Sequence, residues 1–298
     1  MNIEPLPVAA SLLGESPLWH PLEKTLYWCD IPGRRLHRYD PANGQHTEWD
    51  FEHDLGCCAA CDDGTLIVAQ RDGLIRLNPA DGTRSLLARA PYDTAVERFN
   101  DGKTDAQGRF WVGTIYEPRD AARASLYRLD AGRLQQVADG ITTSNGLAWS
   151  PDGRTMYWAD TKAHQITAWD FDLGTGMPSN RRLYAAFPTP EADASPDSYG
   201  GRPDGAAVDA EGCYWVAMFE GARILRLSPQ GEVLQTVSLP VRCPTMPCFG
   251  GPDLRTLYIT TARDKRPAAE LAAMPLSGRV LQMRVDVPGL PANLVRTS

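Results

Sequence analysis

The hydrophobic positions of this chain are dominated by a short triplet that recurs six times. The triplet centres are separated by 40, 44, 46, 58 and 43 residues. Four of the six copies follow closely on a turn that contains glycine, as in Pro151-Asp152-Gly153. The six copies are Leu26-Tyr27-Trp28, Leu66-Ile67-Val68, Phe110-Trp111-Val112, Met156-Tyr157-Trp158, Tyr214-Trp215-Val216 and Leu257-Tyr258-Ile259. Such self-similarity at a nearly constant period is the mark of a repeat architecture.

Further short apolar runs surround each triplet. Gly146-Leu147-Ala148-Trp149 precedes one copy, and a run over 165–170 follows it. A weaker fourth run is seen over 232–237. Four short strands in 40–50 residues are typical of one blade of a β-propeller. We therefore predict an all-β fold, a six-bladed β-propeller with four antiparallel strands per blade, as a single domain over residues 1–298.

A β-sandwich and a helical fold both fit this pattern less well. A β-sandwich with chance self-similarity is disfavoured, because six triplets share one spacing. Helical periodicity is nearly absent, and only the stretch from Pro267 to Met274 predicts a turn or two of helix within a loop.

Composition and charge narrow the class of protein. The 298 residues are 43% hydrophobic and 22% charged, and 25 aromatic side chains exclude disorder. The net charge of −7 argues against a nucleic-acid or anionic-membrane partner, since both need a basic surface. No run approaches the roughly 20 apolar residues of a membrane span, and no signal peptide is visible. With seven cysteines read as reduced thiols, we expect a cytoplasmic location.

Polar residues replace hydrophobic ones at one position of the repeat. In a propeller the first strand of each blade lines the axis, and its starting residue lies 10 to 12 residues before the triplet centre. That position holds Glu15, Asn100, Asn145 and Asp204 in four blades, and Cys57 and Met246 in the other two. Buried carboxylates that face one another must be paired, protonated or neutralised. Four oxygen-bearing side chains therefore predict a divalent cation on the axis; a wet tunnel capped by polar residues without a metal is the alternative.

The sequence motifs around these positions are similar to those of one known family. The segments Gly14-Glu15-Ser16-Pro17-Leu18-Trp19, Arg98-Phe99-Asn100-Asp101-Gly102-Lys103, Ser144-Asn145-Gly146-Leu147-Ala148-Trp149 and Arg202-Pro203-Asp204-Gly205 carry the resemblance. The chain resembles the family of regucalcin (senescence marker protein), gluconolactonases and luciferin-regenerating enzyme. The resemblance implies a six-bladed propeller with one divalent cation on its axis, and hydrolysis of sugar lactones.

The resemblance also implies roles for individual residues. Glu15, Asn145 and Asp204 match the metal ligands of the family, and Asp204 also matches its proposed general base. Arg98 matches the substrate-binding arginine, and Asn100 a residue that touches the substrate and the metal or its water. The all-oxygen ligand set favours Ca²⁺, while Zn²⁺, Mn²⁺, Mg²⁺ and Fe²⁺ also fit it.

The third blade departs from the family pattern. Members often bind substrate through a glutamate just after a Gly-Thr pair, and Gly113-Thr114-Ile115-Tyr116-Glu117 offers Glu117 there. Pro118 stands where some members carry a second acid, which leaves the substrate preference open.

Three loops are expected to rim the site. Because strands alternate in direction, the turn at Pro151-Asp152-Gly153 belongs on the face opposite the axial ligands. The loops from Leu86 to Glu97, Glu117 to Ala124 and Ala185 to Pro203 belong on the ligand face, where long loops usually carry specificity. Arg119 and Arg123 can meet an acidic sugar there or be solvated surface, and we favour the surface interpretation.

Other motifs indicate structure rather than chemistry. Cys58-Ala59-Ala60-Cys61 lacks a second pair at zinc spacing and is assigned to packing. The five histidines form no close pair in the sequence, so a histidine metal site is not expected. No nucleophile elbow, P-loop or dinucleotide fingerprint is present.

The sequence therefore predicts a metal-dependent lactonase that converts a five- or six-carbon aldonolactone to its aldonic acid. One alternative is a non-catalytic calcium-binding protein of the regucalcin type, which has no need of a buried guanidinium such as Arg98 beside the metal. A second is an ester or phosphotriester hydrolase on a similar propeller, which usually adds axial histidines. The partner is a small-molecule sugar lactone, and the oligomeric state stays open.

Overall fold

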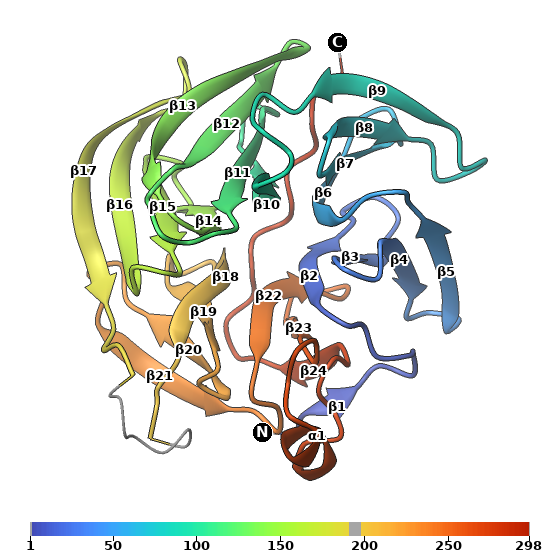
Figure 1. Ribbon diagram of the computed structural model, residues 1–298. Coiled ribbons are helices and arrows are strands. Elements are labelled where there is room, and N and C mark those ends of the chain that lie inside the picture. The colour runs from blue at the N-terminus through green and yellow to red at the C-terminus, as the bar shows by residue number, and fades with distance from the viewer. Residues whose placement is uncertain (1, 191–197, 298) are drawn as a thin grey trace.

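The computed structural model describes residues 2–190 and 198–297. Within them, six four-stranded antiparallel sheets surround a central axis, which confirms the predicted six-bladed β-propeller (Figure 1). The first three blades are built from β2 (Gly14–Trp19), β3 (Leu26–Asp30), β4 (Arg35–Asp40) and β5 (Gln45–Asp50); β6 (Leu55–Ala60), β7 (Leu66–Gln70), β8 (Gly73–Leu77) and β9 (Arg84–Arg89); and β10 (Glu97–Thr104), β11 (Phe110–Tyr116), β12 (Ala124–Asp130) and β13 (Arg133–Ile141).

The next two blades follow the same order, and the last one differs. Their strands are β14 (Ser144–Trp149), β15 (Thr155–Asp160), β16 (Gln165–Asp172) and β17 (Met177–Ala186); and β18 (Arg202–Val208), β19 (Tyr214–Phe219), β20 (Arg223–Leu227) and β21 (Val233–Ser238). The sixth blade comprises β22 (Pro244–Gly250), β23 (Thr256–Thr261), β24 (Leu281–Arg284) and the N-terminal β1 (Glu4–Pro5). Helix α1 (Ala268–Ala273) lies between β23 and β24, where the sequence predicts a helical turn.

Both ends of the chain close the ring. Strand β1 pairs with β24, with Glu4 opposite Gln282, so the outermost strand of the last blade comes from the start of the chain. Leu13 makes a further bridge to Ala262. This closure cannot be predicted from the sequence, because β1 is only two residues long and carries no hydrophobic pattern of its own.

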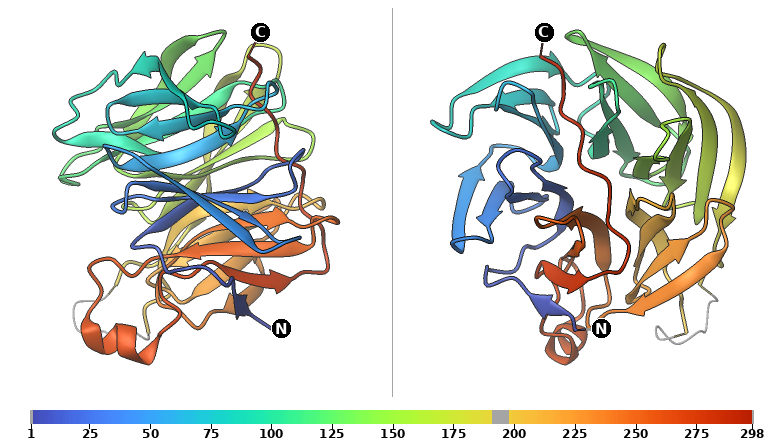
Figure 2. Two further views of the ribbon diagram at one scale, coloured as in Figure 1. Left: turned by 90° about the vertical axis from the view of Figure 1, so that its right-hand side faces the viewer. Right: turned by 180° about the vertical axis from the view of Figure 1, so that it is seen from behind.

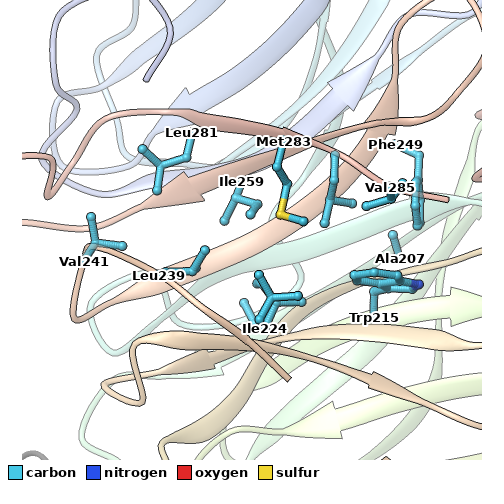
Figure 3. Close-up of a cluster of buried hydrophobic side chains, with 13 residues drawn as sticks. Ala207, Trp215, Ile224, Leu239, Val241, Phe249, Ile259, Leu281, Met283 and Val285 are labelled. Carbon is cyan, nitrogen blue, oxygen red and sulfur yellow. The ribbon is translucent and has the colours of Figure 1, made fainter. Parts of the chain in front are cut away.

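The recurring triplets form the second strand of every blade. These strands are buried on both faces because blades stack against each other, and Trp28, Trp111, Trp158 and Trp215 are among the largest buried side chains. Figure 3 shows one such interface, where Trp215 and Ile224 of the fifth blade face Ile259 and Met283 of the sixth. Blade stacking, rather than one central core, therefore buries the hydrophobic surface.

Bulges in the inner strands set the direction of the axial side chains. The pairing of β14 with β15 shifts between Asn145 and Ala148, and that of β18 with β19 shifts between Pro203 and Ala206. A β-bulge re-aims the side chains beside it, and bulges are common next to active sites. A side chain after Asp204 has no room, since a Cβ on Gly205 would overlap Met246 of the neighbouring blade.

The C-terminal segment crosses the other end of the channel (Figure 2). The amide of Val295 donates to the Ala60 oxygen at 2.8 Å, and that of Arg296 donates to the Gly108 oxygen at 3.0 Å. Residues 290–293 line a channel cavity of about 400 Å³ together with Pro151-Asp152-Gly153. This turn therefore lies away from the axial ligands, as predicted.

Candidate active site

A cavity of about 450 Å³ opens at the mouth of the axis, on the face away from the C-terminal segment. It brings together five of the six predicted site residues, and Glu117 is the exception. The five that line it are Glu15, Arg98, Asn100, Asn145 and Asp204, contributed by β2, β10, β14 and β18. All five are buried. Counting back from the triplets therefore found residues that meet in space, although they are up to 189 positions apart.

A hydrogen-bond chain joins three of these side chains. Arg98 donates from Nη1 to Asn100 Oδ1 at 2.8 Å, and Asn100 donates from Nδ2 to Asn145 Oδ1 at 2.8 Å. Asn145 in turn donates from Nδ2 to Thr161 Oγ1 at 2.8 Å. The chain fixes the orientation of both amides, because each has a donor and an acceptor already engaged. Both polar atoms of Asn100 are in use, so it acts chiefly as a positioning residue.

Burial and nearby carboxylates disfavour ionisation of the two axial acids. Burial, followed by repulsion from Asp204 and Asp101, raises the pKa of Glu15 well above its usual range. Burial also raises the pKa of Asp204 to about 8, against the opposing charges of Arg202 and Arg119. Excess negative charge in a low-dielectric site shifts pKa values upward in this way.

These residues fit a hard divalent cation. Glu15 and Asp204 offer carboxylate oxygens and Asn145 offers a carbonyl oxygen, which is the donor set that Ca²⁺ and similar ions take. Nearby Asp101 accepts from the Leu147 amide through Oδ2, while its Oδ1 is buried with no hydrogen-bond partner among the described residues. Lys103 offsets part of the Asp101 charge, and a bound cation would neutralise the remaining negative charge of the site.

Glu117 lies beside Arg98 rather than in the cavity wall. Its two oxygens accept from Arg71 at 2.8 and 3.0 Å, and the Arg98 Nε lies 3.6 Å from its Oε1. The hydrogen bonds from Arg71 are the main cause of a lowered pKa for Glu117. In this structure Glu117 therefore holds an arginine pair in place, and its proposed contact with substrate would need this pairing to open.

Sequence reasoning missed several residues of the cavity. Lys162, His164 and Arg202 line it. A signal existed for one of them: Arg202 precedes Asp204 by two positions, as Arg98 precedes Asn100. Residues two apart on a strand point to the same face, so the pattern predicts two arginines at the mouth. The structure places Arg119 in the cavity wall and exposed, whereas Arg123 packs over the Tyr116 ring, 5.5 Å from its centroid.

The three expected rim loops contribute unequally. The segment 117–124 supplies Arg119, and the segment 185–203 supplies Thr189, Pro190 and Arg202. The segment 86–97 supplies no lining residue; its Val96 oxygen accepts from the Glu117 amide at 2.9 Å and so supports the neighbouring loop. Residues 191–197, the centre of the longest loop, lie outside the described part of the chain.

Two histidines that are nine positions apart in the sequence meet in the structure, although no histidine metal site was expected. His37 on β4 and His46 on β5 face each other across a hairpin, with Nδ1 and Nε2 3.1 Å apart. Both rings stack on Trp28, and Glu48 Oε1 lies 3.3 Å from His37 Nδ1. The three ligand atoms lie within 4.8 Å of one another, close enough to hold a metal ion, in the first blade and outside the axial cavity.

The cysteines agree with the packing interpretation. All seven are free thiols, and Cys58 and Cys61 are buried in the second blade. No helix of the described residues is long and apolar enough to cross a membrane.

Fold and site together define a six-bladed propeller enzyme with an acidic, oxygen-rich site at one mouth of its axis. The chain belongs to the SMP-30/gluconolactonase/LRE-like family, whose sequence profile matches residues 13–263. It is 47% identical over 280 residues to the 6-deoxy-6-sulfogluconolactonase of Pseudomonas putida, covering 94% of this chain and 93% of that one. Over 278 residues it is 36% identical to regucalcin of Xenopus laevis, covering 91% and 90%.

Solved structures agree with this assignment. The calcium-binding protein regucalcin of Agrobacterium tumefaciens superposes with a TM-score of 0.90 at 28% identity, covering 98% of this chain and 96% of that one. A luciferin-regenerating enzyme superposes with a TM-score of 0.88 at 28% identity, covering 99% of both chains. The family resemblance is confirmed, and so is the prediction that the chain is a lactonase.

Proposed function

We propose that this protein hydrolyses a sugar lactone to the aldonic acid and needs a divalent cation to do so. The observation that carries the proposal is the buried Arg98, which shares a hydrogen-bond chain with Asn100 and Asn145 in a cavity that also holds two carboxylates. Burial lowers the pKa of this guanidinium, so keeping it there has an energetic cost. A cation store has no use for such a group, whereas acyl transfer needs a donor for developing negative charge.

Glu15, Asn145 and Asp204 would hold the cation, with Ca²⁺ favoured by the oxygen donors. A divalent ion bound there would supply Lewis acidity toward the lactone carbonyl and lower the pKa of a water molecule. Asp204 would then accept the proton of the attacking water. The water oxygen bonds to the carbonyl carbon, the ring C–O bond breaks, and the proton passes to the ring oxygen to give the hydroxy acid.

Arg98 lies where it can stabilise the negative charge that develops on the carbonyl oxygen, and the Asn100 amide holds it in position. Glu117 contributes by pairing with Arg98 and Arg71. The substrate class follows the relatives: the Pseudomonas putida protein is named for a gluconolactone that carries a sulfonate at carbon six, and a Bacillus subtilis relative is named a putative sugar lactone lactonase. A six-carbon aldonolactone is therefore the preferred partner.

The cation-binding alternative is supported by the regucalcin relatives and shares the same axial ligands. A panel of aldonolactones, followed by proton release after chelation and again after return of Ca²⁺, Zn²⁺, Mn²⁺ or Mg²⁺, separates the two functions. We expect hydrolysis that disappears with the metal and returns with it. Stoichiometric cation binding without hydrolysis of any lactone would refute the catalytic proposal and favour the binding protein.

A further inference from the structure

The cavity at the axis carries more positive charge than its axial acids explain. Among residues 2–190 and 198–297, four cationic side chains line it, and the lining acids are Glu15 and Asp204. If a divalent cation neutralises those two acids, the cationic side chains remain to be accounted for. The four are Arg98, Arg119, Lys162 and Arg202.

Two of the four have acidic partners outside the cavity. Arg98 lies 3.6 Å from Glu117, and Arg202 Nη1 lies 3.0 Å from Glu220. Arg202 also packs over the Phe219 ring, with its guanidinium carbon 5.0 Å from the centroid. The charges of these two arginines are thus already paired with acidic side chains of the protein.

The other two have none. Within residues 2–190 and 198–297, neither the Arg119 guanidinium nor the Lys162 ammonium makes an ion pair or a side-chain hydrogen bond. They come from neighbouring blades: Arg119 from the loop between β11 and β12, and Lys162 from the turn between β15 and β16. Both are exposed, whereas Glu15, Asn145 and Asp204 are buried, so the two cations stand at the outer end of the cavity.

The buried axial residues at the inner end of the cavity and the two charged side chains at its outer end indicate how a substrate would lie. The lactone carbonyl has to reach the buried axial residues, so the far end of the sugar extends toward the opening. A neutral hydroxymethyl group at that end would not pair with the charges of the Arg119 and Lys162 side chains. An oxyanion would accept charge-assisted hydrogen bonds from both, which are stronger than neutral ones.

We propose that Arg119 and Lys162 form a subsite for a sulfonate or phosphate group at the end of the sugar opposite the lactone carbonyl. This inference rests on the proposed lactonase function and adds the substrate class to it. The shared chemistry is a tetrahedral oxyanion with negative charge, and the experiment compares its two sources.

The kinetic test compares glucono-lactone with its 6-phospho and 6-deoxy-6-sulfo forms. We expect Arg119→Gln and Lys162→Gln each to lower kcat/KM for the anionic lactones by about 10- to 100-fold, the range of a charge-assisted hydrogen bond. Lys162→Gln should leave the value for the neutral lactone within about twofold. Arg119→Gln should lower it much less than the values for the anionic lactones, because the Arg119 charge also acts on Asp204. Arg123→Gln is the matched control, because Arg123 has the same charge in the same loop but does not line the cavity. An equal loss on all three lactones would overturn the proposal.

A binding measurement keeps the subsite testable if hydrolysis itself fails. Isothermal titration of the wild-type protein with gluconate, 6-phosphogluconate and 6-deoxy-6-sulfogluconate should show at least tenfold tighter binding of the last two. The double variant Arg119→Gln/Lys162→Gln should lose that preference, and Arg123→Gln should keep it. A preference for only one anion identifies the substituent. Equal affinity for all three compounds would show that the two cations are ordinary solvated charges.

Discussion

Asn100 donates its side-chain amide to the Asn145 carbonyl oxygen at 2.8 Å, which joins the third blade to the fourth at the axis. The other end of Asn145 is held by Thr161, whose hydroxyl accepts from Nδ2 at 2.8 Å. The oxygen that Asn145 would offer to a metal is therefore oriented from both sides. Partners of metal ligands commonly contribute 10- to 100-fold to affinity or activity.

Thr161→Val should accordingly weaken cation binding by about tenfold, because the Asn145 amide loses its acceptor. Thr161→Ser keeps the hydroxyl and should restore affinity. Calorimetric titration of the metal-free protein with Ca²⁺ measures both. If valine and serine variants bind the ion equally well, Thr161 does not orient the ligand.

Replacing the axial ligands should remove the cation. Asp204→Ala deletes a carboxylate and the candidate base together, so metal content and turnover should both collapse. Glu15→Ala and Asn145→Ala should lower metal content as well, while Asp204→Asn keeps an oxygen donor and should retain more metal than alanine. Elemental analysis after dialysis measures this. Equal metal content in the wild type and all three alanine variants would contradict the assignment.

Arg98→Ala should spare the metal and impair catalysis. The loss of a donor to the developing oxyanion costs roughly 2–4 kcal/mol, or about 30- to 1000-fold in kcat/KM. Arg98→Lys should recover only part of this, since an ammonium cannot reproduce the planar fork of the guanidinium. Unchanged lactone kinetics would instead support the cation-binding alternative.

Gly205→Ala should destabilise the protein through a clash with the neighbouring blade. The added Cβ would overlap Met246, and overpacking of this kind costs about 1–3 kcal/mol. Met246→Gly removes the Cβ, the atom that the new methyl group would meet first, so the double variant should be less destabilised than the two single changes added together. Urea unfolding of the four proteins gives the coupling energy. Strict additivity would show that the two positions do not meet.

The histidine pair of the first blade predicts a loss of stability in acid. Burial lowers the pKa of His37 to about 4, so the folded protein resists a proton that the unfolded chain accepts near pH 6.5. The free energy of unfolding is therefore unaffected by protonation of His37 above pH 6.5. It falls by about 3 kcal/mol as the pH is lowered from 6.5 toward 4. His37→Gln should flatten this part of the stability profile, while His53→Gln should not, since the His53 side chain is 42% exposed to solvent. Parallel profiles for His37→Gln and the wild type would refute the assignment.

Much of the fold and of the axial site could be predicted from the repeat in the sequence and the residue spacing within each repeat. Blade number and the triplet strands could be predicted because each blade is one repeat, and every repeat buries its second strand in the same way. Glu15, Asn145 and Asp204 could be located by counting, because the distance from the mouth of the axis to the triplet is set by one strand, one turn and half of the next strand.

Contacts between different repeats, or between the two strands of a hairpin, could be recognised only in the tertiary structure. Pairing of Glu117 with Arg71, the meeting of Arg119 with Lys162 in one cavity wall, and the closure of the last blade by β1 depend on the angle between blades and on loop conformation. No local pattern encodes these, since their residues lie tens of positions apart. His37 and His46 are closer in sequence, but their contact needs the register of the β4–β5 hairpin, in which a shift of one residue would turn them to opposite faces.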